Sequence, residues 1–141
     1  MPIDFLKQNI LLIALVATSG GMLLWPLIFR SGAKAVSAAE ATMLINREDA
    51  VVLDVRSAAE FADGHIPGAI NVPVERVADK LAELESYRAR PVIVACQSGV
   101  RTGGACGKLK KGGFERLYEL TGGVGSWKQA GLPIKKGKSG R

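Results

Sequence analysis

Short apolar runs alternate with helix-forming segments through residues 37–134 of this 141-residue chain. Ser37 and Ser57 each stand three residues before a glutamate, which is the pattern of a helix-capping box. An apolar run at 51–55 lies between these two helix starts, and another at 92–95 has the length of a buried strand. This alternation predicts an α/β fold in which helices cover both faces of a central parallel sheet. Binding sites of such sheets lie at the carboxyl ends of the strands.

The other elements are expected from the same apolar spacing and from turn residues. Gly64 ends the second helix, and Pro67 with Gly68 predicts a turn into a strand. We expect further strands at 69–72 and near 116–119, and helices over 74–84, from the loop after Cys96 to about Lys111, and around 124–129. These elements make one small domain with accessory segments.

Cys96 is the first residue after the apolar run at 92–95, and the segment beyond the next few residues can continue only as a helix. A loop that curls back between a strand and a helix turns several backbone N–H groups inward, and the helix N-terminus adds about half a positive charge. Such surroundings stabilise a thiolate, which is the nucleophilic form of cysteine. From the local pattern alone, a buried core thiol is the alternative.

The segment from Cys96 to Arg101 resembles the active-site loop of the rhodanese family, which has a Cys, two variable residues, a Gly, one variable residue and an Arg. Stretches before and after this loop also resemble the family, so the likeness covers about residues 37–134. They are Leu53-Asp54-Val55-Arg56, Glu60-Phe61, the run from Gly64 to Pro73, Gly113-Phe114, Leu117, Leu120, Gly122-Gly123, Trp127 and Gly131-Leu132-Pro133. The resemblance implies a rhodanese-like three-layer fold and a single-domain sulfurtransferase.

For such a transferase, the resemblance implies that the Cys96 thiolate attacks the outer sulfur of thiosulfate or of a persulfide and becomes a persulfide itself. A thiol or a cyanide-like acceptor then takes the sulfur, with no metal and no organic cofactor. The donor is a small anion such as thiosulfate, and a protein persulfide is a further candidate donor or acceptor. The loop residues expected to hold the persulfide are Gln97, Ser98, Gly99, Val100 and Arg101.

Asp54 and Arg56 stand where a strand ends near the loop, and the resemblance implies that they support the site. An Asp paired with Arg101 is one physically sensible version of this support. Arg101, together with Arg56, would hold the anionic donor and stabilise the leaving sulfite. Glycines 103, 104 and 107 each cost about 1 kcal/mol relative to Ala in a helix interior, so the first turn after the loop is expected to be soft.

The only histidine and the second cysteine are expected to be structural. His65 lies between a helix-ending Gly and Ile-Pro-Gly, which favours a turn-bracing hydrogen bond over catalysis. Cys106 stands ten residues beyond Cys96, about 15 Å along a regular helix, which favours a core residue over a resolving thiol. Two cysteines at this separation form neither a disulfide framework nor a zinc pattern.

Two other classes of function remain open for this fold. Some rhodanese-like domains are non-catalytic interaction modules, but those typically lack the cysteine, and this chain has both Cys96 and Arg101. A phosphatase or arsenate reductase is the second class. Four residues separate Cys96 from Arg101, whereas cysteine phosphatases place five between theirs, and the tighter ring suits a single sulfur atom.

Residues 10–29 form a run of twenty residues without a charge, which as a helix is about 30 Å long, the thickness of a bilayer's hydrocarbon core. This predicts a transmembrane anchor, and Trp25 near its end suits an interface position. A cleaved signal peptide is the alternative, because Ala33-Lys34-Ala35 has the form of a cleavage site. The chain then divides into a tail (1–9), the anchor (10–29), a linker (30–36), the rhodanese domain (37–134) and a basic tail (135–141).

The positive charge of the chain lies outside the predicted domain. Residues 37–134 contain 12 Lys and Arg and 12 Asp and Glu, so the net charge of +6 comes from the flanks. Positive charge beside an apolar span favours an anionic membrane over nucleic acid as the partner, and a merely solvated tail is the alternative. Lys and Arg are in excess after the span, which predicts a single-pass protein of the inner (cytoplasmic) membrane with a cytoplasmic domain. An exposed thiolate in the loop also survives best in a reducing compartment.

Overall fold

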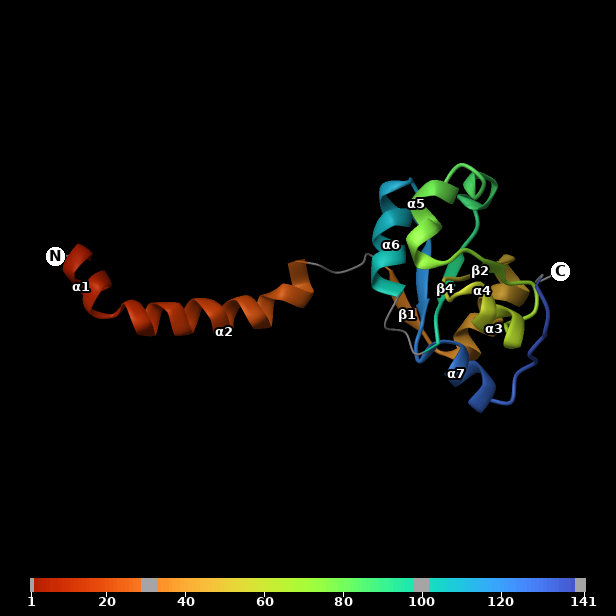
Figure 1. Cartoon of the computed structure of the whole chain (residues 1–141), viewed down its shortest axis with the longest axis horizontal. Coiled ribbons are helices and arrows are strands. Elements are labelled where there is room, and N and C mark those ends of the chain that lie inside the picture. Colours follow the sequence, from red (N-terminus) through yellow and green to blue (C-terminus); the bar gives the residue numbers. More distant parts are fainter. Residues whose placement is uncertain (1, 29–32, 98–101, 139–141) are drawn as a thin grey trace. The chain divides into compact units, whose positions relative to one another are not determined.

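The computed structural model of the chain describes residues 2–28, 33–97 and 102–138. It contains two compact units, Met1–Arg30 and Ser31–Arg141. The second unit is built on a five-stranded, wholly parallel sheet in the order β1-β5-β4-β2-β3 (Figure 1). The strands are β1 (Lys34–Val36), β2 (Val51–Asp54), β3 (Ile70–Asn71), β4 (Val92–Ala95) and β5 (Leu117–Leu120). The predicted α/β class with a central parallel sheet is confirmed.

Each face of the sheet is covered by its own helices and its own apolar cluster. On one face are α3 (Ala38–Glu48), α4 (Ala58–Asp63) and α7 (Gly123–Gln129), and on the other α5 (Val77–Lys80) and α6 (Thr102–Lys111). Side chains of β4 alternate between the two clusters, because successive residues of a strand point to opposite faces. Cys96, which follows β4, belongs to the cluster under α5 and α6.

Both predicted capping boxes are present. The Ser37 hydroxyl accepts a hydrogen bond from the backbone N–H of Glu40 at 3.1 Å, and the Glu40 carboxylate accepts one from the backbone N–H of Ser37 at 3.2 Å. Ser57 and Glu60 make the same reciprocal pair at the start of α4. Each box satisfies two backbone donors that a helix start leaves without partners, so these helix starts could be predicted from local sequence.

The single helix predicted over residues 74–84 is wrong in its geometry. The segment forms a 3-10 turn (Val74–Arg76), the short helix α5, further turns and a second 3-10 turn (Glu85–Tyr87). The Leu84 N–H is shared between the carbonyls of Lys80 and Leu81 at 3.2 Å each. This combines the hydrogen bond of an α-helix with that of a 3-10 helix. Val77 and Leu84 are nevertheless buried, so the apolar spacing predicted the inward side chains correctly.

Parts of both flanks of the predicted domain belong to the second unit. β1, which lies within the predicted linker, pairs in parallel with β5, so residues 34–36 are an edge strand and not a linker. In the predicted C-terminal tail, Lys135 forms an antiparallel bridge with His65 through two backbone hydrogen bonds of 2.9 Å. The Gly137 N–H then donates to the Ala62 carbonyl at 3.0 Å. The start of the tail is therefore bound to the domain.

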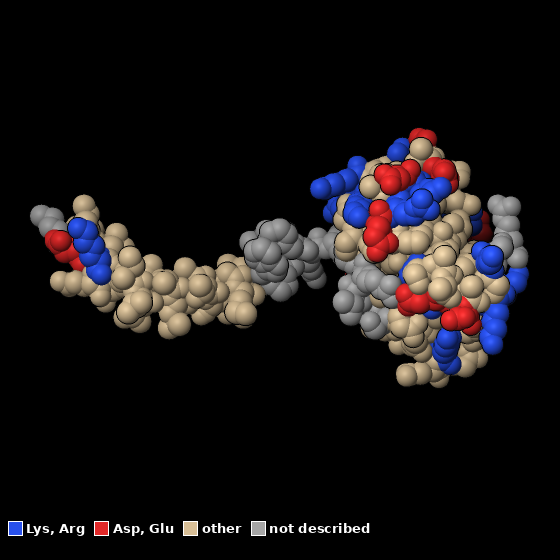
Figure 2. All heavy atoms as spheres, in the orientation of Figure 1, with Lys and Arg blue, Asp and Glu red and all other residues tan. Residues whose placement is uncertain are grey.

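The first unit consists of α1 (Pro2–Gln8) and α2 (Ile10–Ile28). No charged residue occurs in α2, whose described side chains are all tan in Figure 2. Apolar side chains such as those of Leu11 and Met22 are exposed. Within the described residues, neither helix alone has the length and apolar character needed to cross a bilayer. Among the described residues, α1 and Ile10–Leu24 meet the requirements of length and composition only as a pair, and this pair is bent by 77°. The transmembrane anchor stays a prediction.

Candidate active site

The predicted site residues that the structure describes meet at the carboxyl ends of β2 and β4. Asp54 is the last residue of β2 and is the register partner of Ala95, the residue before Cys96. Arg56 stands two residues after Asp54, Gln97 stands directly after Cys96, and the two side chains contact each other. The remaining predicted loop residues, 98–101, lie outside the described residues. The position of Cys96 is the one expected for chemistry on a parallel sheet.

A buried ion pair connects Asp54 to Arg56. The Arg56 Nε donates to Asp54 Oδ1 at 3.0 Å and Nη2 donates to Oδ2 at 2.7 Å, with both residues at most 2% exposed. The backbone N–H of Arg56 also donates to Oδ1 at 3.0 Å. Two parallel N–H···O bonds fix the guanidinium plane against the carboxylate, so this pair has one defined geometry.

The remaining donors of Arg56 connect two other segments to this pair. Its Nη2 also donates to the carbonyl of Gly64 at 2.7 Å, and its Nη1 donates to Oε1 of Gln97 at 3.3 Å. Arg56 is therefore a buried brace, and its part in holding the anionic donor stays a prediction. The partner of Asp54 in the described structure is Arg56, whereas the sequence suggested a pair between an Asp and Arg101.

Asn71, on the edge strand β3, holds the same corner from the other side. Its Nδ2 donates to the carbonyls of Asp54 at 3.1 Å and Arg56 at 2.9 Å. One amide group thereby fixes the chain where it leaves β2. Sequence reasoning did not single out Asn71, because a side chain that bonds only backbone atoms of a distant segment leaves no local signal.

Cys96 is buried, with 1% of its surface exposed. The prediction of an exposed thiol is therefore wrong. Its backbone is bound to the first turn of α7. The Val124 N–H donates to the Cys96 carbonyl at 2.7 Å, and the Gly125 N–H donates to the Gln97 carbonyl at 3.2 Å. The start of the loop is thus held by α7 through its carbonyls and by Arg56 through the Gln97 side chain.

Cys106 has a different setting from Cys96. It is fully buried on α6, and burial, with a smaller contribution from the charge of Glu119, raises the pKa of its thiol to about 12. Thr102 at the start of α6 donates a hydrogen bond to Oε1 of Glu119 at 2.8 Å. At neutral pH the Cys106 thiol is protonated and is not a nucleophile.

Comparison with known proteins gives the family. The sequence profile described as Rhodanese-like domain matches residues 37–130. The chain belongs to the rhodanese-like family.

Relatives of this rhodanese-like chain include a sulfurtransferase. YibN of Escherichia coli (strain K12) is 42% identical over 109 residues, which cover 77% of this chain and 76% of YibN. A sulfurtransferase of Allochromatium vinosum is 36% identical over 91 residues, covering 64% of this chain and 83% of that protein. A solved structure of a rhodanese-related protein from Thermoplasma volcanium is similar with a TM-score of 0.65 and 30% identity, covering 72% of this chain and 97% of that one. A protein named as a sulfurtransferase is therefore among the relatives of this chain.

His65 has a structural role in the rhodanese-like domain, as predicted. It is fully buried, and its Nδ1 donates to the Phe61 carbonyl at 2.7 Å, which fixes the proton on that nitrogen because a carbonyl only accepts. The ring stacks on Phe61 with centroids 3.7 Å apart. These contacts brace the turn after α4.

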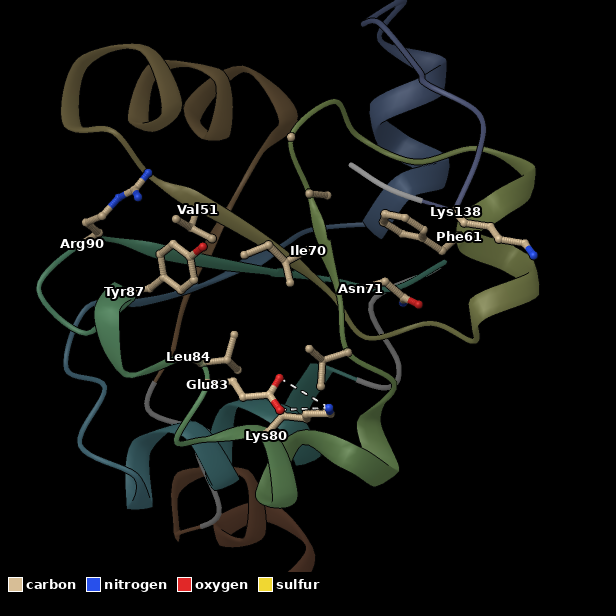
Figure 3. Close-up of a pocket in the computed structure, with 13 residues that line it drawn as sticks. Val51, Phe61, Ile70, Asn71, Lys80, Glu83, Leu84, Tyr87, Arg90 and Lys138 are labelled. Atoms are coloured by element: carbon tan, nitrogen blue, oxygen red, sulfur yellow. Dashed lines mark hydrogen bonds and ion pairs between the residues drawn. The ribbon is translucent and has the colours of Figure 1, made fainter. Parts of the chain in front are cut away.

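A cavity in the described part of the rhodanese-like domain is not lined by the candidate nucleophile. It has a volume of about 530 Å³ and lies beside the edge strand β3 (Figure 3). Ile70 and Tyr87 line it, and at its rim Lys80 pairs with Glu83. Cys96, Gln97 and Arg56 do not line it. Because chemistry on a parallel sheet occurs at the strand ends, we assign the site to the end of β4 and not to this cavity.

Proposed function

We propose that the chain is a sulfurtransferase that carries sulfane sulfur as a persulfide on Cys96. The observation that carries this proposal is the position of Cys96 as the first residue after the central strand β4, within a segment that has the family's Cys and Arg spacing. Cys106, the other thiol of the chain, is held in its protonated form. Cys96 is therefore the thiol available for covalent catalysis.

The chemistry balances without a metal or an added oxidant. The Cys96 thiolate attacks the outer sulfur of thiosulfate, a new S–S bond forms, and the old S–S bond breaks with its electron pair leaving on sulfite. The product is a Cys96 persulfide anion. An acceptor thiolate or cyanide then attacks the terminal sulfur and regenerates the Cys96 thiolate. The residues proposed to stabilise the negative charge are the loop amides from Gln97 to Arg101 and the Arg101 guanidinium.

Intact mass spectrometry of the full chain in detergent, before and after incubation with thiosulfate, tests this function. We expect the mass of one added sulfur atom, and its loss on addition of cyanide. An unchanged mass would contradict the persulfide mechanism and would favour a non-catalytic interaction module.

The first unit is proposed to anchor the domain in the inner membrane by a single span, with the domain in the cytoplasm. Support comes from the uncharged residues 10–29 and from the exposed apolar side chains of α2. Orientation follows the Lys and Arg bias near a span. Only Lys7 precedes it, whereas Arg30, Lys34 and Arg47 follow it.

Two reporter fusions after Arg141 test this orientation. A fluorescent protein that matures only in the cytoplasm should be active, and alkaline phosphatase, which is active only outside, should not. The reverse pattern would overturn the orientation. A mature chain shortened to begin near Val36 would show that the first unit is a cleaved signal peptide.

A further inference from the structure

The first turn of α7 contacts the start of the candidate active-site loop more closely than any side chain would permit. Besides the two hydrogen bonds from Val124 and Gly125, the backbone of Gly123 packs directly against Cys96. A Cβ at Gly123 would overlap the Cys96 carbonyl oxygen and would stand 2.9 Å from the Gln97 carbonyl carbon. Gly123 also has φ +61°, a conformation that L side chains rarely adopt. We call residues 123–125 the α7 seat.

The α7 seat fixes the direction of the loop's first amide. In a planar trans peptide the C=O and the N–H of one unit point in opposite directions. The Cys96 carbonyl is directed at the α7 seat by the 2.7 Å bond from Val124, so the N–H of Gln97 points away from α7. Both the backbone and the side chain of Gln97 are held in place, because its carbonyl accepts a hydrogen bond from Gly125 and its side chain accepts one from Arg56.

From these contacts we infer that Gly123, Val124 and Gly125 are positioning residues for sulfur transfer. By binding the carbonyls of Cys96 and Gln97, they turn the first N–H group of the loop to the side opposite α7, where it is available to an anion on the Cys96 sulfur. Preoriented donors of this kind stabilise developing charge without reorganisation. The inference rests on the proposed function, and it adds the α7 seat to the residues on which that function depends.

Gly131 provides a matched control for Gly123. Both glycines have positive φ, +61° and +75°, so alanine introduces similar backbone strain at either position. A Cβ at Gly131 meets nothing within 4 Å, whereas at Gly123 it displaces the loop. A difference between Gly123→Ala and Gly131→Ala therefore reports displacement of the loop and not strain in the backbone.

The readout is the ratio of Cys96 alkylation rates with iodoacetate and with iodoacetamide, measured on the full chain in detergent. The first reagent is an anion and the second is neutral, so the ratio reports how well the loop attracts negative charge. We expect Gly123→Ala to lower this ratio at least about tenfold and to slow persulfide formation about 100-fold, and Gly131→Ala to change neither more than about twofold. Alkylation of the buried Cys106 monitors unfolding in every variant.

Gly125→Ala keeps the inference testable if Gly123→Ala does not fold. Its Cβ would stand 3.2 Å from the Gln97 carbonyl oxygen, so it should lower the ratio by less than Gly123→Ala but more than Gly131→Ala. Equal ratios in folded Gly125→Ala and Gly131→Ala, or in folded Gly123→Ala and Gly131→Ala, would overturn the inference. Absence of any persulfide in the unaltered chain would contradict the proposed function instead, because the alkylation ratio does not depend on sulfur transfer.

Discussion

Cys96 and Cys106 are the same residue type, lie in the same apolar cluster and are both buried, but their surroundings differ. Cys96 ends a central strand, where its backbone is bound by α7 and its neighbour Gln97 by a buried arginine. Cys106 lies within a helix near Glu119, and both burial and that carboxylate favour its neutral thiol. Exposed fraction alone therefore does not separate the proposed nucleophile from Cys106, whereas their places in the fold do, one at the end of a strand and the other within a helix.

Replacement of each cysteine by serine should give the largest difference in sulfur-transfer activity between the two sites. Cys96→Ser is expected to abolish sulfur transfer, because a serine hydroxyl forms no persulfide, and Cys106→Ser to retain most of it. Thiosulfate-to-cyanide turnover of both variants measures this. Loss of activity in the Cys106 variant alone would show that the nucleophile is assigned to the wrong cysteine.

Removal of the buried brace should destabilise the fold around Cys96. Arg56→Met leaves the Asp54 carboxylate buried without its partner, and breaking such a pair costs about 3–5 kcal/mol. The control is Arg116→Met, which removes an exposed pair with Glu48 and should change little. Urea unfolding of the three proteins gives the free energies. A brace variant as stable as the control would show that the ion pair does not support this corner.

Removal of the Gln97 side chain should lower the stability of the fold by less than removal of the Arg56 brace. Gln97→Ala removes one acceptor of Arg56 and leaves the Asp54 pair intact, so we expect a loss of about 1 kcal/mol in stability. Sulfur transfer should fall about tenfold, because the start of the loop is less well held. Urea unfolding and turnover measured together test both effects. Unchanged turnover would indicate that the backbone bonds to α7 suffice.

The smallest effect near neutral pH is expected from Cys106, which makes stability depend on pH only in alkaline solution. Its pKa rises from the ordinary 9.0 to about 12 on folding, so between these values the folded state keeps a proton that the unfolded chain releases. The stabilisation is fully present below about pH 9 and is lost as the pH rises toward 12. Unfolding free energies at about pH 8 and about pH 10 should therefore differ less in Cys106→Ala than in the unaltered chain. Equal slopes would contradict the raised pKa.

Sequence was sufficient where structure depends on local signals. The capping boxes at Ser37 and Ser57 and the apolar run of β4 each lie within a few residues, and all three are found where predicted. β1 was missed because three residues are too few to show a strand period, and its pairing with β5 is distant in sequence.

The features that could not be predicted from the sequence depend on contacts between segments that are distant in the chain. The order of charges near the loop did not reveal that Arg56 would turn back onto Asp54 and also contact Gly64. Gly123 belongs to a glycine pair noted only as part of the family likeness. The need for glycine at position 123 arises from a contact between distant segments, because the Cys96 carbonyl occupies the space where a side chain would begin.

The location of the transferred sulfur tests the account most directly. Arg101 lies between the two cysteines, so trypsin places Cys96 and Cys106 on different peptides. The full chain would be treated with thiosulfate, blocked with an alkylating reagent, digested and analysed by mass spectrometry. We predict one added sulfur on the Cys96 peptide and none on the Cys106 peptide. Sulfur on the Cys106 peptide, or on neither peptide, would contradict the account.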